Sequence, residues 1–351
     1  MGISVANFAV AAAHHASRIP AQQLLQVRNL RVRYRSNDDD AEFTVTVLDG
    51  IDFNIAAGEF VGLLGESGCG KTTTALSLLS LVPDNARVVQ GSVLFADRDL
   101  LSLDEPKLRR VRGAEVALIY QDSSVLNPVM RAGDQVSEVL RAHRRCTARE
   151  ARQETEALFA SIGLSDTARI YDAYPHQLSG GQRQRIAISQ ALICKPRLVI
   201  ADEPTASVDK NTARQILDFL KRLQQSSGTS FLFISHDPAT LASLADRIMV
   251  MYAGQIVESG PVADVYSRPL HPYTRALLQC APRSIAPAEP GCVRHRLPTI
   301  PGSAPDRLDG LSGCSFANRC SDRMPVCDSM KPVAVQTSES WSTRCFKYEA
   351  R

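Results

Sequence analysis

Eight residues in the first quarter of the chain combine the groups that bind a nucleotide phosphate. Residues 65–72 read GESGCGKT and fit the phosphate-loop pattern G-x-x-x-x-G-K-[ST]. Glycines let the backbone turn its N–H groups toward phosphate oxygens, and the helix expected after the loop adds partial positive charge. The predicted phosphate-binding residues are Gly65, Ser67, Gly68, Cys69, Gly70, Lys71, Thr72 and Thr73.

Within this loop, each side chain has its own expected role. Lys71 supplies a full charge to the β- and γ-phosphates, and the Thr72 hydroxyl is a ligand for Mg²⁺. Cys69 is expected to act as a small residue that offers its N–H, and not as a nucleophile. The alternative for the motif alone is a glycine-rich turn with an incidental lysine.

Polar residues follow three further apolar runs at the points where strands should end. Asp202 and Glu203 follow LVIA, which suits a Mg²⁺ ligand and a general base for an attacking water. His236 follows FLFIS and could orient that water, and Gln121 follows VALIY and could sense Mg²⁺. Taken alone, two exposed acids at a helix start or a lone polar strand end would be the simpler interpretations.

A second anion-binding pattern lies at residues 178–182, which read LSGGQ and precede an expected helix. A hydroxyl and flexible N–H groups at a helix N-terminus attract anions. One nucleotide does not need two such sites from one domain, so this site is expected to serve a nucleotide held by a second copy or a paralogue. The residues concerned are Ser179, Gly180, Gly181 and Gln182.

Four of the nine cysteines gather near the end of the chain, at Cys314, Cys320, Cys327 and Cys345. An odd total and a nucleotide motif favour a reducing compartment, so metal ligation is considered before disulfides. Four thiolates can hold a [4Fe–4S] cluster or Zn²⁺, but the gaps between them are not the short C-x-x-C pairs of zinc ribbons. Spacing alone leaves metal ligation and four unrelated thiols equally open.

Hydrophobic patterning predicts the elements that position these residues. Strands are expected in residues 24–60, 60–64, 91–95, 116–120, 198–201 and 231–235, with a hairpin over 248–258 that turns at Gly254. Helices are expected over 71–81, 148–162, 211–225 and 238–245, and residues 131–192 are mostly helical in pattern.

The bulk properties limit the classes of function. The 351 residues allow two domains, and a net charge of +3 gives no case for nucleic acid as a partner. No window approaches the 18 apolar residues of a membrane span, and the apolar N-terminus lacks the basic start of a secretory signal. After residue 260 proline and cysteine become frequent. Residues 282–305 are interpreted as a linker, and 306–351 as a small loop-rich module without a core of its own.

Together these motifs resemble the ABC ATPase family over about 240 residues, in the order phosphate loop, Gln121, LSGGQ, LVIADE and His236. The resemblance implies an α/β P-loop NTPase cassette, with a RecA-like core, an antiparallel β-subdomain and an α-helical subdomain at about residues 122–190. It also implies ATP and Mg²⁺ as ligands and a head-to-tail ATPase dimer. The expected boundaries are an extension at 1–23, the cassette at 24–260 and a cysteine-containing domain at 261–351.

The same resemblance assigns roles to single residues. Glu203 would be the catalytic base with His236 as its partner, and residues 206–209 would carry signals between the two ATP sites. Tyr34 would stack on adenine, with Phe43 as the alternative. Val208 stands where many relatives have leucine, which is a conservative departure.

A narrower resemblance, to the dipeptide/oligopeptide importer ATPases, rests on QDSSVLNP at 121–128, HPYTRALL at 271–278 and IPGSAPD at 300–306, together with the cysteine tail. It implies peptide import with two permeases, a paralogous ATPase and an extracytoplasmic binding protein, at the cytoplasmic face of the inner membrane. It also implies a [4Fe–4S] cluster on the four cysteines. Nickel or metal-chelate import, export, and soluble ABC ATPases of DNA repair or translation are the alternatives.

Overall fold

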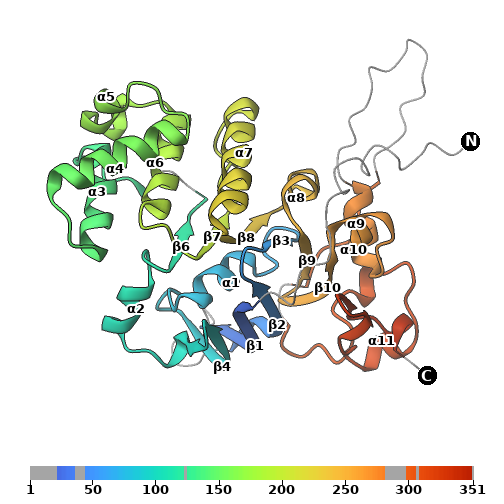
Figure 1. The fold of residues 1–351 in the computed structure, drawn as a ribbon. Coiled ribbons are helices and arrows are strands. Elements are labelled where there is room, and N and C mark those ends of the chain that lie inside the picture. Colours follow the sequence, from blue (N-terminus) through green and yellow to red (C-terminus); the bar gives the residue numbers. More distant parts are fainter. Residues whose placement is uncertain (1–21, 36–43, 122–124, 281–297, 306–307, 350–351) are drawn as a thin grey trace, which may run out of the picture.

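Two β-sheets and a layer of helices make up the described part of this computed structural model, residues 22–35, 44–121, 125–280, 298–305 and 308–349 (Figure 1). None of the helices formed by these residues combines the length and the apolar character needed to cross a bilayer. Most of the N-terminal extension, Phe43 and most of the expected linker lie outside the described residues.

The smaller sheet is antiparallel, and its strand order is β2-β1-β4-β5. Its strands are β1 (Gln23–Tyr34), β2 (Val45–Ala56), β4 (Ala86–Phe95) and β5 (Arg98–Asp99). Alternation along β1 buries one set of side chains against the larger sheet, as period-two patterning requires. This sheet brings the end of β1 next to the phosphate loop.

The larger sheet has the order β11-β12-β10-β9-β3-β8-β7-β6. Its parallel strands are β3 (Phe60–Leu64), β6 (Val116–Ile119), β7 (Leu198–Asp202), β8 (Ser230–Ser235) and β9 (Arg247–Tyr252). These strands are continuous apolar runs because both faces of the sheet are covered. Their carboxyl ends meet at one edge, where the polar residues singled out above lie.

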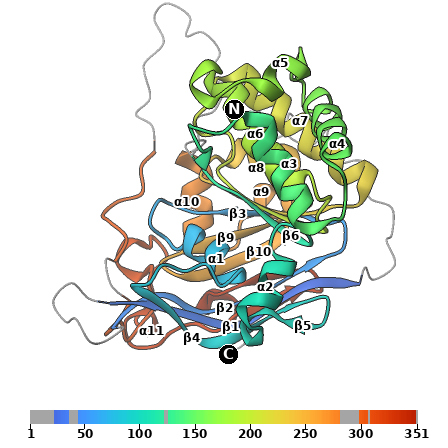
Figure 2. The same cartoon turned by 90° about the vertical axis from the view of Figure 1, so that its left-hand side faces the viewer.

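Helices cover both faces of this sheet. Alternate residues of β3 enter two different hydrophobic clusters, one with α1 (Lys71–Leu78) and one with α7 (Lys210–Ser227) and α8 (Pro238–Leu244). Between β6 and β7 the chain forms a separate helical layer, visible at the top of Figures 1 and 2. Its helices are α3 (Ala132–His143), α4 (Ala148–Ser161), α5 (Thr167–Asp172) and α6 (Gly180–Leu192), and α2 (Glu105–Val111) precedes it.

The C-terminal segment differs from its sequence prediction because it joins the core of the cassette. The strand β12 (Trp341–Thr343) pairs with β10 (Gln255–Pro261), and β11 (Val335–Ser338) pairs with β12, so both extend the larger sheet. Gly260 permits this packing, since a Cβ there would lie 2.5 Å from the Trp341 ring. The helices of this region are α9 (Val262–Ser267), α10 (Pro272–Cys280) and α11 (Val326–Ser329).

A hydrophobic cluster shared between the cassette and the C-terminal segment corrects the expectation of a module without a core. Tyr252 and Val257 of the β9–β10 hairpin pack there with Tyr273, Leu308 and Phe316. Burying one large apolar side chain stabilises the fold by about 1.5–3 kcal/mol, so several of them are enough to hold such a segment in place. The segment is loop-rich, as predicted, but it is packed on the cassette.

Candidate functional site

The phosphate loop lies between β3 and α1 and adopts backbone angles that only glycine takes easily. Gly70, which precedes the first turn of α1, has φ 108°, and Gly68 has φ 80°. Gly65 is required for a different reason, because a Cβ there would lie 2.4 Å from the Met251 carbonyl oxygen. The loop therefore depends on glycine at each of these three positions, of which the motif itself specifies Gly65 and Gly70.

Lys71 and Cys69 complete the inner surface of the loop. The Lys71 Nζ donates to the Gly65 and Glu66 carbonyl oxygens, both at 2.9 Å, and the side chain is buried. Burial raises the pKa of the Cys69 thiol despite the nearby Lys71 charge, so the sulfur stays protonated. A protonated, buried thiol is a poor nucleophile.

Thr72 and Asp202 meet at the carboxyl edge of the sheet. The Thr72 hydroxyl donates to Asp202 Oδ2 at 2.7 Å, which joins the start of α1 to the end of β7. Burial raises the pKa of Asp202, while the Thr72 hydrogen bond opposes that rise. Gln121 follows β6, the strand next to β7, and is exposed. One carboxylate with a hydroxyl suits Mg²⁺, which nucleotide sites hold largely through phosphates and water.

Glu203 and His236 also come together, from the ends of the neighbouring strands β7 and β8. His236 Nδ1 lies 2.9 Å from Glu203 Oε1, and the Glu203 side chain is 15% exposed. Glu203 has φ 46°, in the left-handed region, and its N–H donates to the Ile234 carbonyl oxygen at 3.0 Å. Such backbone strain in a non-glycine residue is typical of functional sites, where the surroundings impose it.

The LSGGQ residues lie apart from the phosphate loop, in the helical layer (Figures 1 and 2). Ser179 caps α6: its hydroxyl accepts the Gln182 N–H at 3.2 Å, and Gln182 Oε1 accepts the Ser179 N–H at 2.9 Å. Gly181 faces α7, where a Cβ would lie 3.0 Å from Thr212 Cγ2. The capping box fixes the helix start and leaves the N–H groups of the first turn directed outward.

The loop expected to carry signals between sites ends at the start of α7. Asp209 caps that helix and accepts the N–H groups of Asn211 and Thr212, both at 3.0 Å. These backbone hydrogen bonds lower the pKa of Asp209. Since Thr212 also faces Gly181, the segment after Glu203 leads directly to the LSGGQ helix.

Tyr34, the residue expected to stack on adenine, lies at the end of β1 and is half-buried. Its hydroxyl is 3.3 Å from the Thr73 hydroxyl of α1. This contact joins the end of β1 to the first turn of α1, two residues after Lys71. The alternative residue, Phe43, lies outside the described residues.

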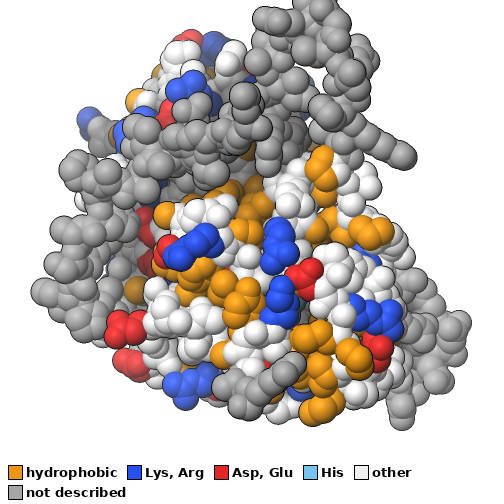
Figure 3. Space-filling model, turned by 90° about the vertical axis from the view of Figure 1, so that its right-hand side faces the viewer, with side chains coloured by type: hydrophobic (Ala, Val, Ile, Leu, Met, Phe, Trp, Pro, Cys, Tyr) orange, Lys and Arg blue, Asp and Glu red, His pale blue; other side chains and the backbone are white. Residues whose placement is uncertain are grey.

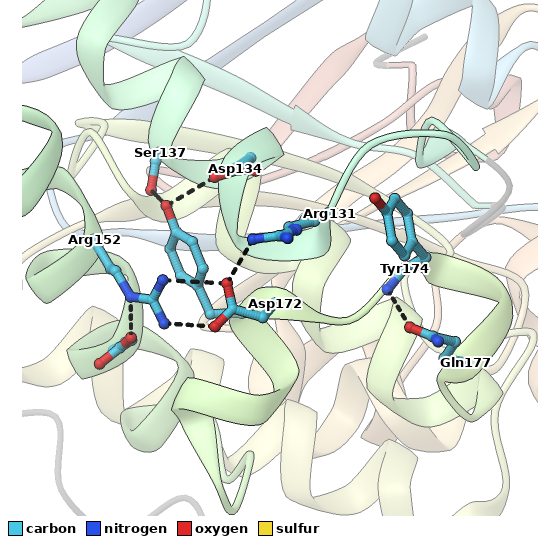
Figure 4. Close-up of polar contacts among 9 residues, drawn as sticks. Arg131, Asp134, Ser137, Arg152, Asp172, Tyr174 and Gln177 are labelled. Carbon is cyan, nitrogen blue, oxygen red and sulfur yellow. Dashed lines mark hydrogen bonds and ion pairs between the residues drawn. The ribbon is translucent and has the colours of Figure 1, made fainter.

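An ion-pair network holds the helical layer together (Figure 4). Asp172 accepts from Arg152 Nη2 at 2.8 Å and from Arg131 Nη1 at 3.1 Å. The Arg152 guanidinium lies 4.2 Å from the centroid of the Tyr171 ring, and these contacts join α3, α4 and α5. A surface groove is lined by Val125, Asn127, Met130, Gln135, Glu138, Val139, Ala142, His143 and Gln190.

The four C-terminal cysteines line one small cavity, together with His271 and Phe316. Burial raises the pKa of Cys314 to about 11 and raises the pKa values of Cys320 and Cys345. Among the residues that the structure describes, no group of three or more His, Cys, Asp or Glu side chains is arranged to hold a metal ion. The cysteines thus converge, but the structure gives no support for the expected [4Fe–4S] cluster.

Two residues of the C-terminal region that the sequence prediction did not include touch the phosphate loop. Arg319 forms an ion pair with Glu66, and the Tyr273 hydroxyl accepts the Glu66 N–H at 3.0 Å. A weak signal for Tyr273 exists in the sequence, because this residue lies in the HPYTRALL segment. Nothing in the spacing links Arg319 to a residue 253 positions earlier.

Comparisons with known proteins identify the family of this chain. Family models match residues 48–206 ("ABC transporter") and 257–327 ("Oligopeptide/dipeptide transporter, C-terminal region"). The dipeptide transport ATP-binding protein DppD of Bacillus subtilis is 38% identical over 94% of this chain and 96% of its own length. The oligopeptide transport ATP-binding protein AppD of the same organism is 40% identical over 93% and 97%.

A solved structure has the same cassette fold. It is a dimeric, post-hydrolysis form of the ATP-binding cassette MJ0796 bound to ADP and Pi, 27% identical, with a TM-score of 0.61 over 68% of this chain and 98% of that one. The P-loop cassette fold predicted from the sequence is confirmed by this likeness. This chain belongs to the ABC transporter ATP-binding proteins of the oligopeptide/dipeptide transporter family, ATPases coupled to transport.

Proposed function

We propose that this chain hydrolyses ATP with Glu203 as general base, to power import of peptides or similar small solutes. The 2.9 Å contact between Glu203 and His236, beside the Thr72–Asp202 pair, is the observation that carries the proposal. Glu203 accepts a proton from water as that water attacks the γ-phosphorus, and ADP leaves. His236 holds the carboxylate in place, and Lys71 binds the β- and γ-phosphates of ATP.

Substitution of the base tests this role directly. Glu203→Gln keeps the shape of the side chain but cannot accept the proton, so we expect hydrolysis to fall at least about 100-fold while ATP binding persists. Glu154→Gln, which changes an exposed glutamate of α4, is the matched control and should retain wild-type turnover. Unchanged hydrolysis in clean Glu203→Gln protein would remove Glu203 from the reaction.

The geometry supports a two-site assembly. The start of α6 lies apart from this chain's own phosphate loop and carries Ser179, Gly180, Gly181 and Gln182. It is free to meet the γ-phosphate of ATP held by a second ATPase subunit. The ATP and Mg²⁺ held by this chain itself would be bound by Tyr34, the loop residues 65–73, Gln121 and Asp202. In a head-to-tail pair with the paralogous ATPase, Ser179→Arg should abolish the ATP-dependent association of the Glu203→Gln protein with that subunit, measured by light scattering.

Two permease subunits are the proposed partners at the groove beside α3. Its lining includes the exposed apolar Val125 together with Glu138 and His143, and Val129, also exposed, is close by in the chain. Such a groove suits a short amphipathic helix from a membrane subunit. The paralogous ATPase, the extracytoplasmic binding protein and a peripheral position at the cytoplasmic face of the inner membrane belong to the same proposal.

The names of the relatives support peptides as the cargo class, since DppD and AppD are called dipeptide and oligopeptide transport proteins. Nickel or metal-chelate import is the alternative within the family. Nucleic acid is disfavoured because the face formed by the C-terminal elements carries acidic beside basic side chains, with hydrophobic ones between them (Figure 3). Uptake of a labelled dipeptide by cells with the intact transporter, lost in Glu203→Gln, tests the cargo; nickel uptake with no peptide uptake would contradict it.

For the cysteine segment, we propose a [4Fe–4S] cluster with a structural role. Four thiols on one cavity are a suitable donor set, and ligation requires their side chains to turn inward and lose the protons that burial retains. Anaerobic protein should then contain iron and absorb broadly near about 400 nm. Cys314→Ala should remove this absorbance, whereas Cys194→Ala should keep it, and colourless, iron-free protein would contradict the cluster.

A further inference from the structure

One buried arginine connects the C-terminal segment to the phosphate loop. Arg319 ends the single-turn helix Ala317–Arg319, between Cys314 and Cys320. Its Nη1 donates to Glu66 Oε2 at 2.8 Å, and its Nη2 donates to Glu66 Oε1 at 3.0 Å. Two parallel hydrogen bonds fix the carboxylate in direction as well as in distance. The Arg319 side chain is 6% exposed, so water does little to weaken this pair.

Glu66 is the second residue of the phosphate loop, and its backbone is held as firmly as its side chain. Its N–H donates to the Tyr273 hydroxyl of α10 at 3.0 Å. Its carbonyl oxygen accepts from Lys71 Nζ at 2.9 Å. Since Lys71 also bonds to the Gly65 carbonyl, a shift of Glu66 would move the lysine expected to meet the phosphates.

The two anchors are themselves rigid. Arg319 Nε donates to the Pro301 carbonyl oxygen at 2.9 Å, and Glu66 raises the pKa of Arg319, so the guanidinium stays charged. Tyr273 packs against Tyr252, with ring centroids 4.6 Å apart, and against Phe316, at 5.4 Å. Both anchors therefore hold Glu66 from a packed cluster and not from a mobile surface.

We infer that Arg319 and Tyr273 are positioning residues that hold the phosphate loop in its nucleotide-binding shape. Neither residue belongs to the loop, and both act through Glu66. A loop with glycines at positions 65, 68 and 70 has many alternative shapes, and fixing one of them before ATP arrives lowers the entropic cost of binding. The inference rests on the proposed assignment of residues 65–73 to ATP binding.

This role predicts a specific kinetic signature. Phosphate contacts are made in the ground state and the transition state alike, so their loss raises KM for ATP and leaves kcat largely unchanged. In the full-length chain assembled with its transporter subunits, we expect Arg319→Ala to raise KM about tenfold, with kcat within about twofold of wild type. Tyr273→Phe should raise KM about threefold.

Three controls separate this role from a general loss of stability. Arg323→Ala breaks an exposed ion pair with Asp328 in the same segment and should leave KM unchanged. Arg319→Lys keeps the charge but not the paired geometry and should give an intermediate KM. In a double-mutant cycle, Glu66→Gln combined with Arg319→Ala should raise KM no further than Arg319→Ala alone.

The outcomes distinguish the inference from the proposed function. If Lys71→Ala abolishes ATP binding while Arg319→Ala and Tyr273→Phe leave KM unchanged, the positioning role is overturned and the loop assignment stands. If Lys71→Ala also leaves ATP binding intact, the loop assignment itself is wrong. If Arg319→Ala does not fold, Tyr273→Phe decides alone, because it removes a single hydroxyl: a raised KM supports the role and an unchanged KM overturns it.

Discussion

At the scale of single residues, Glu203 shows how the fold imposes a conformation on a reactive group. Its φ of 46° is unfavourable for a side chain with a Cβ, by about 1–2 kcal/mol. The hydrogen bond from the Glu203 N–H to the Ile234 carbonyl oxygen holds this backbone conformation, which directs the carboxylate at His236. The site therefore holds its base in place at some cost in stability.

This strain predicts that removing the Cβ of residue 203 stabilises the fold even though the activity is lost. Glu203→Gly removes the Cβ that causes the strain, whereas Glu203→Ala removes the carboxylate and keeps the Cβ. We expect the glycine variant to unfold with a free energy about 0.5–1 kcal/mol higher than the alanine variant, although both are inactive. Denaturant titration with equal m-values measures the difference. Equal stability in the two variants would mean that the backbone at this position is not strained.

At the scale of elements, the start of α10 is built around a buried polar cluster. Glu258, which is 1% exposed, accepts the N–H groups of Leu270 and His271, both at 2.9 Å, and the Trp341 ring N–H at 3.0 Å. His271 in turn accepts the Tyr273 N–H at Nδ1. The HPYTRALL segment, which sequence alone marks as a family pattern, thus ties β10, α10 and β12 together.

Burial of His271 predicts a loss of stability in mild acid. Burial lowers the pKa of this imidazole from 6.5 to about 3. Below about pH 6.5 the unfolded chain takes up a proton that the folded chain refuses, so stability falls as the pH falls through this range. From pH 7 to about pH 5, we expect the free energy of unfolding to drop by about 2 kcal/mol through this residue.

The variant His271→Asn isolates this contribution. Asparagine offers an acceptor near the Nδ1 position but does not titrate, so the variant should lose less stability than wild type between these two pH values. Urea titrations of both proteins at each pH provide the comparison. Identical pH dependence in the two proteins would assign the acid sensitivity to other groups.

How well the sequence predicts this structure depends on how far apart in the chain the contacting residues lie. The strand Phe60–Leu64 was predicted to the residue because a continuous apolar run between turn residues leaves little choice. Thr72 and Asp202, each expected to bind Mg²⁺, lie next to each other because the phosphate loop and β7 meet at the edge where the parallel strands end. The contact between Arg319 and Glu66 was missed, because no local pattern encodes a pairing of residues 253 positions apart.

At the scale of the whole molecule, the cassette and the C-terminal segment share their interior. Trp341 is 7% exposed and packs into the cluster that contains Phe60 and Phe231 of the larger sheet. Phe316 and Leu308 fill a second cluster against the β9–β10 hairpin. Asp309 also binds β2, accepting from the Thr46 N–H at 2.7 Å and from its hydroxyl at 2.6 Å. The segment therefore touches the larger sheet, the smaller sheet and the phosphate loop.

Removal of the C-terminal segment after residue 280 should destabilise the cassette as well. Loss of one buried aromatic side chain costs about 3–5 kcal/mol, and a domain of ordinary stability has only about 5–15 kcal/mol. We expect a chain truncated after residue 280 to unfold cooperatively at a much lower temperature or to aggregate, and Trp341→Ala to lower the melting temperature in the same direction. Arg323→Ala, which breaks an exposed ion pair of the same segment, is the control and should leave the melting temperature nearly unchanged. Calorimetry of the three variants decides the question: a truncated chain that melts like wild type would mean that the cassette is stable alone.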